Sequence, residues 1–288
     1  AERAHIEIPQ HHRGGNSAAS DEKKRLFGIL EWAENEFHRF LLEAREAQRA
    51  RDYLASRGFD KDLITKFRIG YHPGNWLQGR SQGKHKAEEF VAVRLMGERD
   101  GGNGFYDNFV DRVLFPIRDA RSRPVAFGGR ILPDTKQRTD AKYWNSPDSQ
   151  FFSKSNLLYA YDVARESIRR SETAIVVEGY TDCITLHQNG LGNAVATLGT
   201  SLTDSHVSLL KRLAQRVVLL YDGDEAGQRA TERALSMFLA QKLDLRVLTL
   251  PEGMDPADFI AERGADELRE RIDTATEAWE HKLQSSIA

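Results

Sequence analysis

Acidic side chains that could bind a divalent cation follow three apolar segments in the second half of the chain. They are Glu178, Asp182, Asp222, Asp224, Asp255 and Asp258. Gathered at one place, so many carboxylates would repel one another unless a hard cation lay among their oxygens. Mg²⁺ (or Mn²⁺) prefers such oxygens, together with water and substrate phosphate oxygens. One cation can activate an attacking oxygen while a second holds a leaving phosphate. These residues therefore predict metal-assisted chemistry on a phosphate ester.

Each acidic group follows a segment with the composition of a buried strand. Residues 174–177 are apolar and mostly β-branched, which favours a strand buried on both faces of a parallel sheet. Gly179 allows a turn, and a helix is expected from Tyr180 to Gln188. Segments 216–221 and 244–250 repeat the strand-then-helix pattern. Because strands joined through helices run parallel, their carboxyl ends share one edge, where ligands bind in open α/β sheets.

Helix capping is the alternative role for these acids, because Asp and Glu favour helix N-termini. For any single residue it is as good as metal binding. The pair Asp222 and Asp224, taken with Glu178, favours the metal. The only cysteine of the chain, Cys183, excludes an internal disulfide and a Cys-rich zinc site, and a small buried side chain is the simplest role for it.

Three of these segments resemble the TOPRIM domain of bacterial DnaG-type primases. They are Val176-Val-Glu178-Gly-Tyr-Thr-Asp182, Thr197-Leu-Gly199-Thr200-Ser201 and Tyr221-Asp222-Gly-Asp224-Glu-Ala-Gly227. The resemblance implies an α/β fold with a doubly wound, mostly parallel TOPRIM sheet. It also implies that Glu178, Asp222 and Asp224 are catalytic and hold Mg²⁺, with Asp182 and Asp255 completing the acidic rim.

The family also differs from this chain at one acidic position. It often has Asp-Pro-Asp where this chain has Asp255-Pro-Ala-Asp258, so Asp258 is left out of the predicted ligands. In the wider family the glutamate is proposed as a general acid or base. A carboxylate beside a metal has a lowered pKa, so a ligand or water-positioning role suits Glu178 at least as well.

Segments further upstream also resemble the primase core, over roughly residues 46–260. They are Tyr53-Leu-Ala-Ser-Arg57-Gly58, Arg112-Val-Leu-Phe-Pro-Ile-Arg118, Phe127-Gly-Gly-Arg130 and Lys142-Tyr143-Trp-Asn145-Ser-Pro147. The residues expected to contact nucleic acid or nucleotide are Arg57, Arg112, Arg118, Arg130, Lys142, Tyr143, Asn145, Lys154, Gly199 and Thr200.

Several of these positions fit a purely structural role equally well. Residues 111–119 and 124–132 predict an antiparallel hairpin in which Gly128-Gly129 admits another backbone and Arg130 meets a phosphate. A bulge with an exposed arginine would give the same pattern. Cations among aromatics at 141–154 suit a single strand, but also a polar loop with a small core. Arg57 could simply be a cation at a helix C-terminus, and the loop at Gly199 a helix cap.

Charge is unevenly distributed along the chain, whose net charge is −2. Residues 109–170 contain 12 Lys/Arg and 7 Asp/Glu, hence +5, and residues 173–288 contain 11 and 18, hence −7. A basic segment beside an acidic one suits a metal site next to a polyanion. Solvated helix faces would produce the same asymmetry.

The length of 288 residues suits about two domains. We expect a linker or disordered tail at 1–19, an amino-terminal α+β basic subdomain at 20–170, a TOPRIM domain at 171–262 and a helical segment at 263–288. Within these, a helix is expected from Ser20 to about Leu42, and helices at 157–170, 265–274 and 276–285. No apolar run approaches the roughly 20 residues of a membrane span and no signal peptide is evident, so we expect a cytoplasmic protein.

The expected function is the synthesis of RNA primers on single-stranded DNA during replication. The resemblance implies a single-stranded template, ribonucleoside triphosphates and an RNA–DNA hybrid as ligands. No zinc-ribbon cysteines or helicase-binding region are evident and the chain begins with Ala, so we expect the catalytic core alone, with the replicative helicase bound through an absent region. The alternatives are a TOPRIM nuclease or topoisomerase-like enzyme, and a non-catalytic module that binds single strands or nucleotides.

Overall fold

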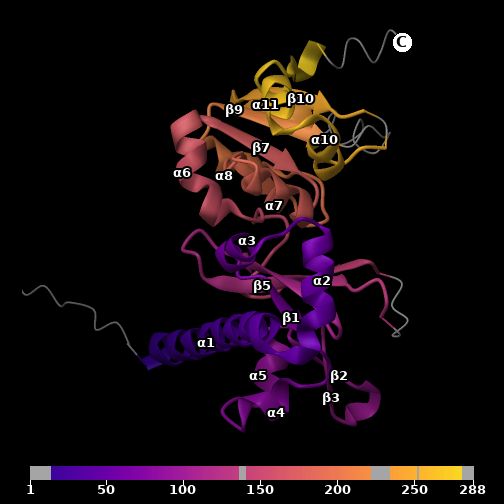
Figure 1. Ribbon diagram of the computed structural model, residues 1–288. Coiled ribbons are helices and arrows are strands. Elements are labelled where there is room, and N and C mark those ends of the chain that lie inside the picture. The colour runs from indigo at the N-terminus through magenta and orange to yellow at the C-terminus, as the bar shows by residue number, and fades with distance from the viewer. Residues whose placement is uncertain (1–13, 136–140, 222–233, 252, 281–288) are drawn as a thin grey trace, which may run out of the picture.

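Two β-sheets, one in each half of the chain, organise the computed structural model (Figure 1). The structure describes residues 14–135, 141–221, 234–251 and 253–280. The first large sheet has the strand order β1-β4-β5-β6, and the second has the order β11-β10-β9-β7-β8. A small antiparallel pair, β2 and β3, falls between β1 and β4 in the sequence. Among the described residues, no helix is both long enough and apolar enough to cross a bilayer.

The second sheet is mostly parallel, as predicted. Its strands are β7 (Thr173–Val177), β8 (Ala194–Ala196), β9 (Arg216–Tyr221), β10 (Asp244–Thr249) and β11 (Thr276–Glu277). Strands β8, β7, β9 and β10 run parallel, and β11 pairs antiparallel with β10. Its helices are α6 (Tyr161–Ser171), α7 (Tyr180–Gln188), α8 (Asp204–Lys211), α10 (Pro256–Arg263) and α11 (Ala265–Asp273).

Alternate residues of β7 pack against helices on opposite faces of this sheet, because successive strand side chains point to opposite sides. Ile175 and Val177 belong to a core cluster that includes residues of α7, α10 and α11. Ala174 and Val176 belong to a second cluster with residues of α6 and α8. The sheet is therefore covered on both sides, which explains why β7 is a continuous apolar run.

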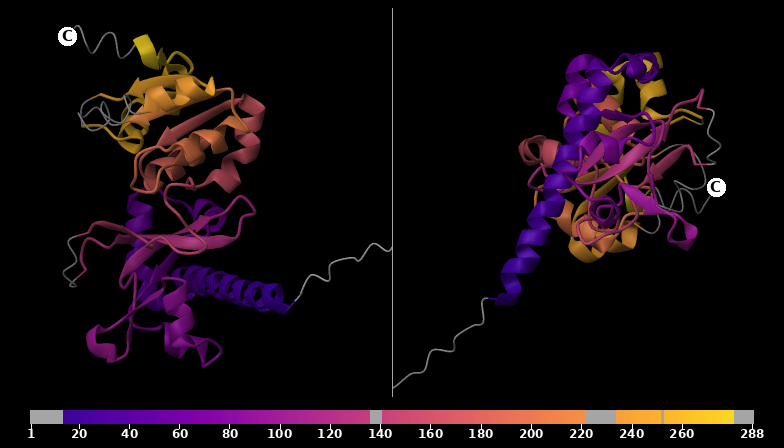
Figure 2. Two further views of the ribbon diagram at one scale, coloured as in Figure 1. Left: turned by 180° about the vertical axis from the view of Figure 1, so that it is seen from behind. Right: turned by 90° about the horizontal axis from the view of Figure 1, so that it is seen from below.

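The first sheet is antiparallel and packs with helices of the amino-terminal half. Its strands are β1 (Gly70–His72), β4 (Arg112–Arg118), β5 (Pro124–Ile131) and β6 (Tyr143–Asn145), and the small pair is β2 (Met96–Glu98) and β3 (Phe105–Asp107). The helices are α1 (Gly14–Glu43), α2 (Gln48–Ser56), α3 (Lys61–Lys66), α4 (Leu77–Ser81) and α5 (Ala87–Ala92), with short 3₁₀ turns at Arg45–Ala47 and Asp100–Gly102. β4 and β5 form the predicted hairpin. Figure 2 shows α1 projecting from the rest of the molecule.

Several predicted element boundaries were wrong. α1 begins at Gly14 rather than at Ser20, so the segment 14–19 is not a tail. Ala18 and Ala19 are strong helix formers, and extending an established helix costs little. α6 starts at Tyr161 rather than at residue 157. The helix expected from Thr276 is preceded by strand β11, because residues 276–277 pair with β10.

One hydrophobic cluster spans both halves of the molecule. It joins Leu54 of α2 and Phe115 of β4 to Ile175 of β7 and Cys183 of α7. The two sheets are thereby held next to each other through shared core. The division into subdomains at residues 170 and 171 stays a proposal.

Candidate functional site

The carboxyl end of β7 presents Glu178 at the edge of the second sheet. β7 is buried up to Val177, and Glu178 is exposed. Gly179 then acts as the extended N-cap residue of α7, with φ −108° and ψ 152°. A Cβ atom at residue 179 would collide with the carboxylate of Asp182, so glycine is needed for the carboxylate to pack there. Glu178 and Asp182 thus flank one turn at this edge, which we call the carboxyl edge.

The neighbouring strand ends at the same edge. β9 runs parallel to β7 with Val176 opposite Leu219, so Tyr221 at the end of β9 is level with Glu178. Asp222 and Asp224 follow Tyr221 in the sequence and lie outside the described residues. Their predicted place beside Glu178 stays a prediction.

Asp255 caps a helix. Its side chain accepts a hydrogen bond of 2.8 Å from the backbone N–H of Asp258, and Pro256 occupies the first position of α10. This is the capping alternative that the sequence left open. A carboxylate has further lone pairs, so capping and metal binding are compatible. The metal role of Asp255 stays a prediction.

The donors at the carboxyl edge suit a hard cation. Within the described residues, no three His, Cys, Asp or Glu side chains lie close enough together to hold a metal ion. Glu178 and Asp182 supply carboxylate oxygens, and the nearest sulfur in sequence, on Cys183, is buried, where burial raises the pKa of the thiol well above its usual range. Oxygen donors without a thiolate favour Mg²⁺ or Mn²⁺ over zinc. The described residues therefore fit part of the predicted metal site.

Tyr180 connects the carboxyl edge to the first sheet. Its hydroxyl donates to Oδ1 of Asn145 on β6, and its ring stacks on Phe115 of β4 with centroids 5.5 Å apart. A Cβ atom at Gly128 of β5 would lie 2.6 Å from the Tyr180 ring. Gly128 therefore makes room for an aromatic ring, not for another backbone as predicted. Burial raises the pKa of Tyr180, so its hydroxyl remains a donor.

Asn145 joins β6 to the first residue of α7 and to the loop that follows β8. Besides accepting from Tyr180, it donates through Nδ2 to the carbonyl of Leu198 at 2.9 Å. Gly199, at φ +71°, follows directly, and a Cβ there would lie 3.5 Å from the Asn145 amide. The N-cap of α8 is Thr203, which accepts from the N–H of His206. The Gly199 loop thus lies before the helix, next to β6, and the half-buried Thr200 belongs to it.

We call the contact of Tyr180 with Asn145, between the carboxyl edge and the first sheet, the junction. Arg130 lies beside it, between two tyrosine rings. Its guanidinium carbon is 5.2 Å from the ring centroid of Tyr143 and 5.6 Å from that of Tyr53. Arg130 is paired with Tyr143 across β5 and β6, and the Tyr143 ring is 6.3 Å from that of Tyr180. In the described part of the chain, the buried Nε of Arg130 has no hydrogen-bond partner. Nη1 of the same guanidinium donates to the carbonyl of Ile131 at 2.6 Å, so the group is anchored and keeps its remaining Nη donors for an anionic ligand.

Two predicted arginines have intramolecular partners. Buried Arg112 donates to the carbonyl of Gly129 at 3.2 Å and to that of Ala141 at 3.0 Å. Arg118 donates to Glu34 Oε1 at 2.8 and 2.9 Å. Both side chains stabilise the first sheet and its neighbours. Their predicted contact with nucleic acid stays a prediction.

The remaining predicted residues are dispersed. Lys142 is exposed and directly precedes Tyr143, the first residue of β6. Exposed Arg57 is the C-cap residue of α2, the position at which a helix dipole favours a cation. Half-buried Lys154 donates its N–H to Asp148 at 3.3 Å, and its carbonyl lies 3.0 Å from His206 Nε2. Of the predicted nucleic-acid residues, Arg130, Tyr143, Asn145 and Gly199 are brought together.

Sequence reasoning did not single out Tyr180 or Tyr53. Both stand inside the quoted motifs, at the first position of α7 and in the Tyr-Leu-Ala-Ser-Arg-Gly segment. Their partners, Asn145 and Arg130, come from distant parts of the chain. Neither position carried a local signal beyond an aromatic residue in a helix that the sequence predicts.

Two family models match the chain. A model described as "DNA primase catalytic core, N-terminal domain" matches residues 37–165, and a model described as "Toprim-like" matches residues 175–260. A DNA primase of Halalkalibacterium halodurans is 38% identical over 278 residues, covering 94% of this chain and 45% of the relative. A DNA primase of Pseudomonas aeruginosa is 37% identical over 281 residues, covering 94% and 42%. The chain thus spans less than half the length of these relatives.

Solved structures of primase cores share the fold. The RNA polymerase domain of Mycobacterium tuberculosis primase DnaG has a TM-score of 0.84 and 33% identity, with 92% of this chain and 88% of that chain covered. A DnaG primase catalytic domain bound to single-stranded DNA has a TM-score of 0.81 and 33% identity, with 90% and 84% covered.

Proposed function

Because the chain belongs to the DnaG-type primase family, we propose that it synthesises short RNA primers on single-stranded DNA by metal-dependent nucleotidyl transfer. A 3′-hydroxyl oxygen would form the new bond to the α-phosphorus of an incoming ribonucleoside triphosphate, and pyrophosphate would leave. The ligands in this proposal are template, ribonucleotides and the RNA–DNA hybrid. We place the reaction at the replication fork in the bacterial cytoplasm, with the replicative helicase as a partner of the whole protein.

The observation that carries the proposal is the junction at the carboxyl edge. Exposed Glu178 lies two residues before Tyr180, which is bonded to Asn145 of β6. Arg130 and Tyr143 lie on the same strand pair as Asn145. An acidic edge is thus joined to a cation and an aromatic ring on the opposite sheet. Nucleotidyl transfer requires this combination, with a metal site for the triphosphate next to groups that bind phosphates and bases.

Metal binding in this proposal falls to Glu178, Asp222 and Asp224, with Asp182 and Asp255 completing the acidic rim. Bound Mg²⁺ or Mn²⁺ would neutralise the charge of the triphosphate and favour departure of pyrophosphate. A cation lowers the pKa of a neighbouring carboxyl group, so Glu178 would be ionised and would act as a ligand or position a water molecule. The turn at Gly179 fixes Asp182 beside it.

The first sheet would position the nucleic acid. Arg130 would meet a phosphate oxygen through the Nη donors of its half-buried guanidinium, because a planar guanidinium matches phosphate geometry. Tyr143, whose side chain is exposed, offers a ring for base stacking. Asn145 and Tyr180 would hold the two sheets in register without touching substrate. Lys142, Lys154 and Arg57 would add phosphate contacts along the strand.

The substitution Asp222→Asn tests the proposal most directly. We expect it to abolish primer synthesis from ribonucleotides on a single-stranded template in Mg²⁺ or Mn²⁺. Affinity for single-stranded DNA should be equal or higher, because a negative charge facing a polyanion is removed. Asp204→Asn is a matched control, since this exposed acid lies in the first turn of α8 and makes the same change of charge.

The products separate the outcomes. Short RNA from the wild-type chain and from Asp204→Asn, with none from Asp222→Asn, would support the proposal. Cleaved DNA would indicate a nuclease instead, and retention of the template without any product would indicate a binding module. Unchanged synthesis by Asp222→Asn would refute the metal role of that residue.

A further inference from the structure

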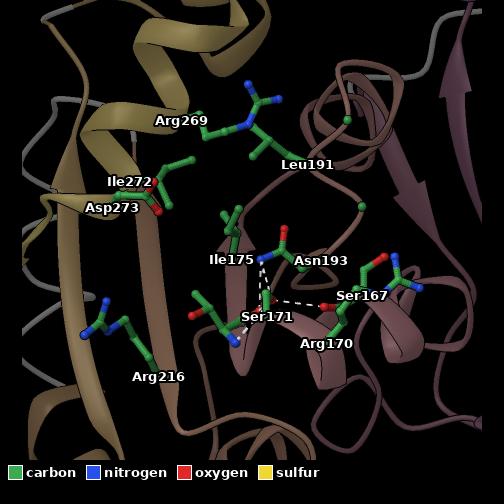
Figure 3. A pocket seen from close by; sticks show the side chains of 13 residues that line it. Ser167, Arg170, Ser171, Ile175, Leu191, Asn193, Arg216, Arg269, Ile272 and Asp273 are labelled. Carbon is green, nitrogen blue, oxygen red and sulfur yellow. Dashed lines mark hydrogen bonds between the residues drawn. The ribbon is translucent and has the colours of Figure 1, made fainter.

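A hollow lies at the opposite edge of the second sheet from Glu178 (Figure 3). It is formed where β7, β8 and β9 begin, between the ends of α6 and α7 and the side of α11. We call this the amino edge. Because β7 has five residues, the two edges are separated by roughly 16 Å. The hollow has a volume of about 490 Å³, within the range of about 300–1,000 Å³ typical of small-molecule sites.

Three arginines surround this hollow. Arg170 lies in the last turn of α6, Arg216 begins β9 and Arg269 lies on α11, and Figure 3 shows them on three sides of the space. The only acidic side chain among the lining residues is Asp273. The lining residues thus carry three positive charges against one negative charge, and two of the arginines, Arg216 and Arg269, are paired with Asp244 and Asp266. Guanidinium groups that line a concavity attract anions to it.

The arginines keep donors for a ligand. Arg216 donates through Nε to Asp244 at 2.9 Å, and Arg269 donates through Nη2 to the carbonyl of Asn189 at 3.2 Å and through Nη1 to Asp266. A guanidinium has five N–H donors, so each retains several. For Arg170, no hydrogen bond or ion pair is found within the described residues. Its guanidinium is exposed in the last turn of α6, where the helix dipole favours a cation, and all its donors remain for a ligand.

Neutral groups inside the hollow suit hydroxyls. Asn193 donates through Nδ2 to the carbonyl of Thr173 at 2.9 Å, which leaves its amide oxygen as an acceptor. Half-buried Ser167 lies beside Gly192, where a Cβ atom would come within 3.0 Å of the serine hydroxyl. The small residue thus keeps this side open. Arginines around hydroxyl and amide groups supply the donors and acceptors that suit a phosphorylated, hydroxyl-bearing molecule.

We propose that the hollow at the amino edge binds a nucleotide-sized phosphate ester, with its phosphates on Arg170, Arg216 and Arg269 and its hydroxyls on Asn193 and Ser167. This site is separate from the carboxyl edge and needs no metal. Shared phosphate chemistry admits pyrophosphate as well as a nucleoside triphosphate. Volume favours the triphosphate, because pyrophosphate would leave most of the space unfilled.

The test is calorimetric titration of the full chain with adenosine triphosphate and with pyrophosphate in the presence of EDTA, so that metal-dependent binding at the carboxyl edge is suppressed. Arg170→Glu should weaken binding about tenfold or more, because it reverses a charge facing the phosphates. Arg169→Glu is the matched control, since this exposed residue is the neighbour of Arg170 on α6 and does not line the hollow. Its affinity should stay within about twofold of the wild type.

Position is checked by photo-crosslinking with an azido derivative of adenosine triphosphate. Labelled peptides should come from residues 161–193 and 265–273. Equal affinities of Arg170→Glu and Arg169→Glu, or loss of binding in Glu178→Gln, would overturn the proposal. The proposal would also be overturned if neither adenosine triphosphate nor pyrophosphate bound. It would be overturned as well if only a 5′-phosphorylated oligonucleotide bound. A negative result in these binding experiments would not affect the proposal of primer synthesis, because the primer-synthesis assay tests residues at the carboxyl edge.

Discussion

The two edges of the mostly parallel second sheet present different charged side chains, with acids at the carboxyl edge and three arginines at the amino edge. Strand β7 has a glutamate next to each end, Glu172 before it and Glu178 after it. Glu172 accepts a hydrogen bond from Gln215 at 2.7 Å and stands on an edge with three arginines. Glu178 stands next to Asp182 on the edge where the two sheets meet. The same residue type therefore has a structural role at one end of the strand and a candidate catalytic role at the other.

Helix dipoles account for part of this difference. In a parallel sheet, connecting helices place their N-termini at the carboxyl edge and their C-termini at the amino edge. The partial positive charge of an N-terminus favours acids such as Asp182 in the first turn of α7, and the C-terminus of α6 favours Arg169 and Arg170. Dipoles explain the sign of the charge at each edge, but not why Arg170 lines a hollow while Arg169 does not.

The largest expected effect compares the two glutamates directly. Glu178→Gln should lower primer synthesis about a thousandfold, equivalent to about 4 kcal/mol of barrier, because an amide cannot replace a carboxylate at a metal site. Glu172→Gln makes the same replacement of a carboxylate by an amide at the other end of β7. It should retain primer synthesis within about twofold of the wild type. Primer yield per enzyme, measured at saturating ribonucleotide, decides the comparison. Equal losses would mean that the edges differ in charge but not in function.

Local sequence was sufficient to predict the acidic edge. The apolar run before Glu178 specifies a buried strand, Gly179 specifies the turn, and both depend only on neighbouring residues. The parallel order followed because helices separate the strands. The position of Asp222 was predicted by the same logic and lies outside the described residues.

Contacts between distant segments could not be predicted. The pairing of Tyr180 with Asn145 joins residues 35 apart, and the need for glycine at 128 appears only once the Tyr180 ring is placed over it. β11 has only two residues, and its strand conformation depends on β10 rather than on its own composition. The hollow at the amino edge collects residues from α6, β9 and α11, none of which forms a motif.

A pH experiment tests how far dipoles govern the amino edge. His187 lies in the last turn of α7, where a dipole favours the cation, yet burial lowers its pKa to about 4. Because the unfolded chain binds this proton near pH 6.5 and the folded chain does not, stability should fall as pH drops from about 6.5 to 4. The contribution should reach about 3 kcal/mol in the unfolding free energy.

Urea denaturation at several pH values measures this contribution. His187→Gln should lose the part of the slope between pH 6.5 and 4, while His85→Gln should keep it. His187 is anchored by a contact of 2.9 Å between its Nε2 and the carbonyl of Ala194, so the variant is compared by slope rather than by absolute stability. Identical slopes in all three proteins would show that the dipole, not burial, sets the charge of His187.

The smallest expected effect concerns the junction that distinguishes the carboxyl edge. Tyr180→Phe removes the hydroxyl that donates to Asn145 but keeps the ring on Phe115 and Gly128, so it should cost about 1 kcal/mol of unfolding free energy. Primer synthesis should nevertheless fall several-fold, because β6 would no longer be fixed to the Glu178 loop. Tyr161→Phe is the matched control, since its hydroxyl makes only a long bond of 3.4 Å to the carbonyl of Leu209. If both variants lost synthesis equally, the Tyr180 bond would matter for stability alone, and the carboxyl edge would not depend on its attachment to the first sheet.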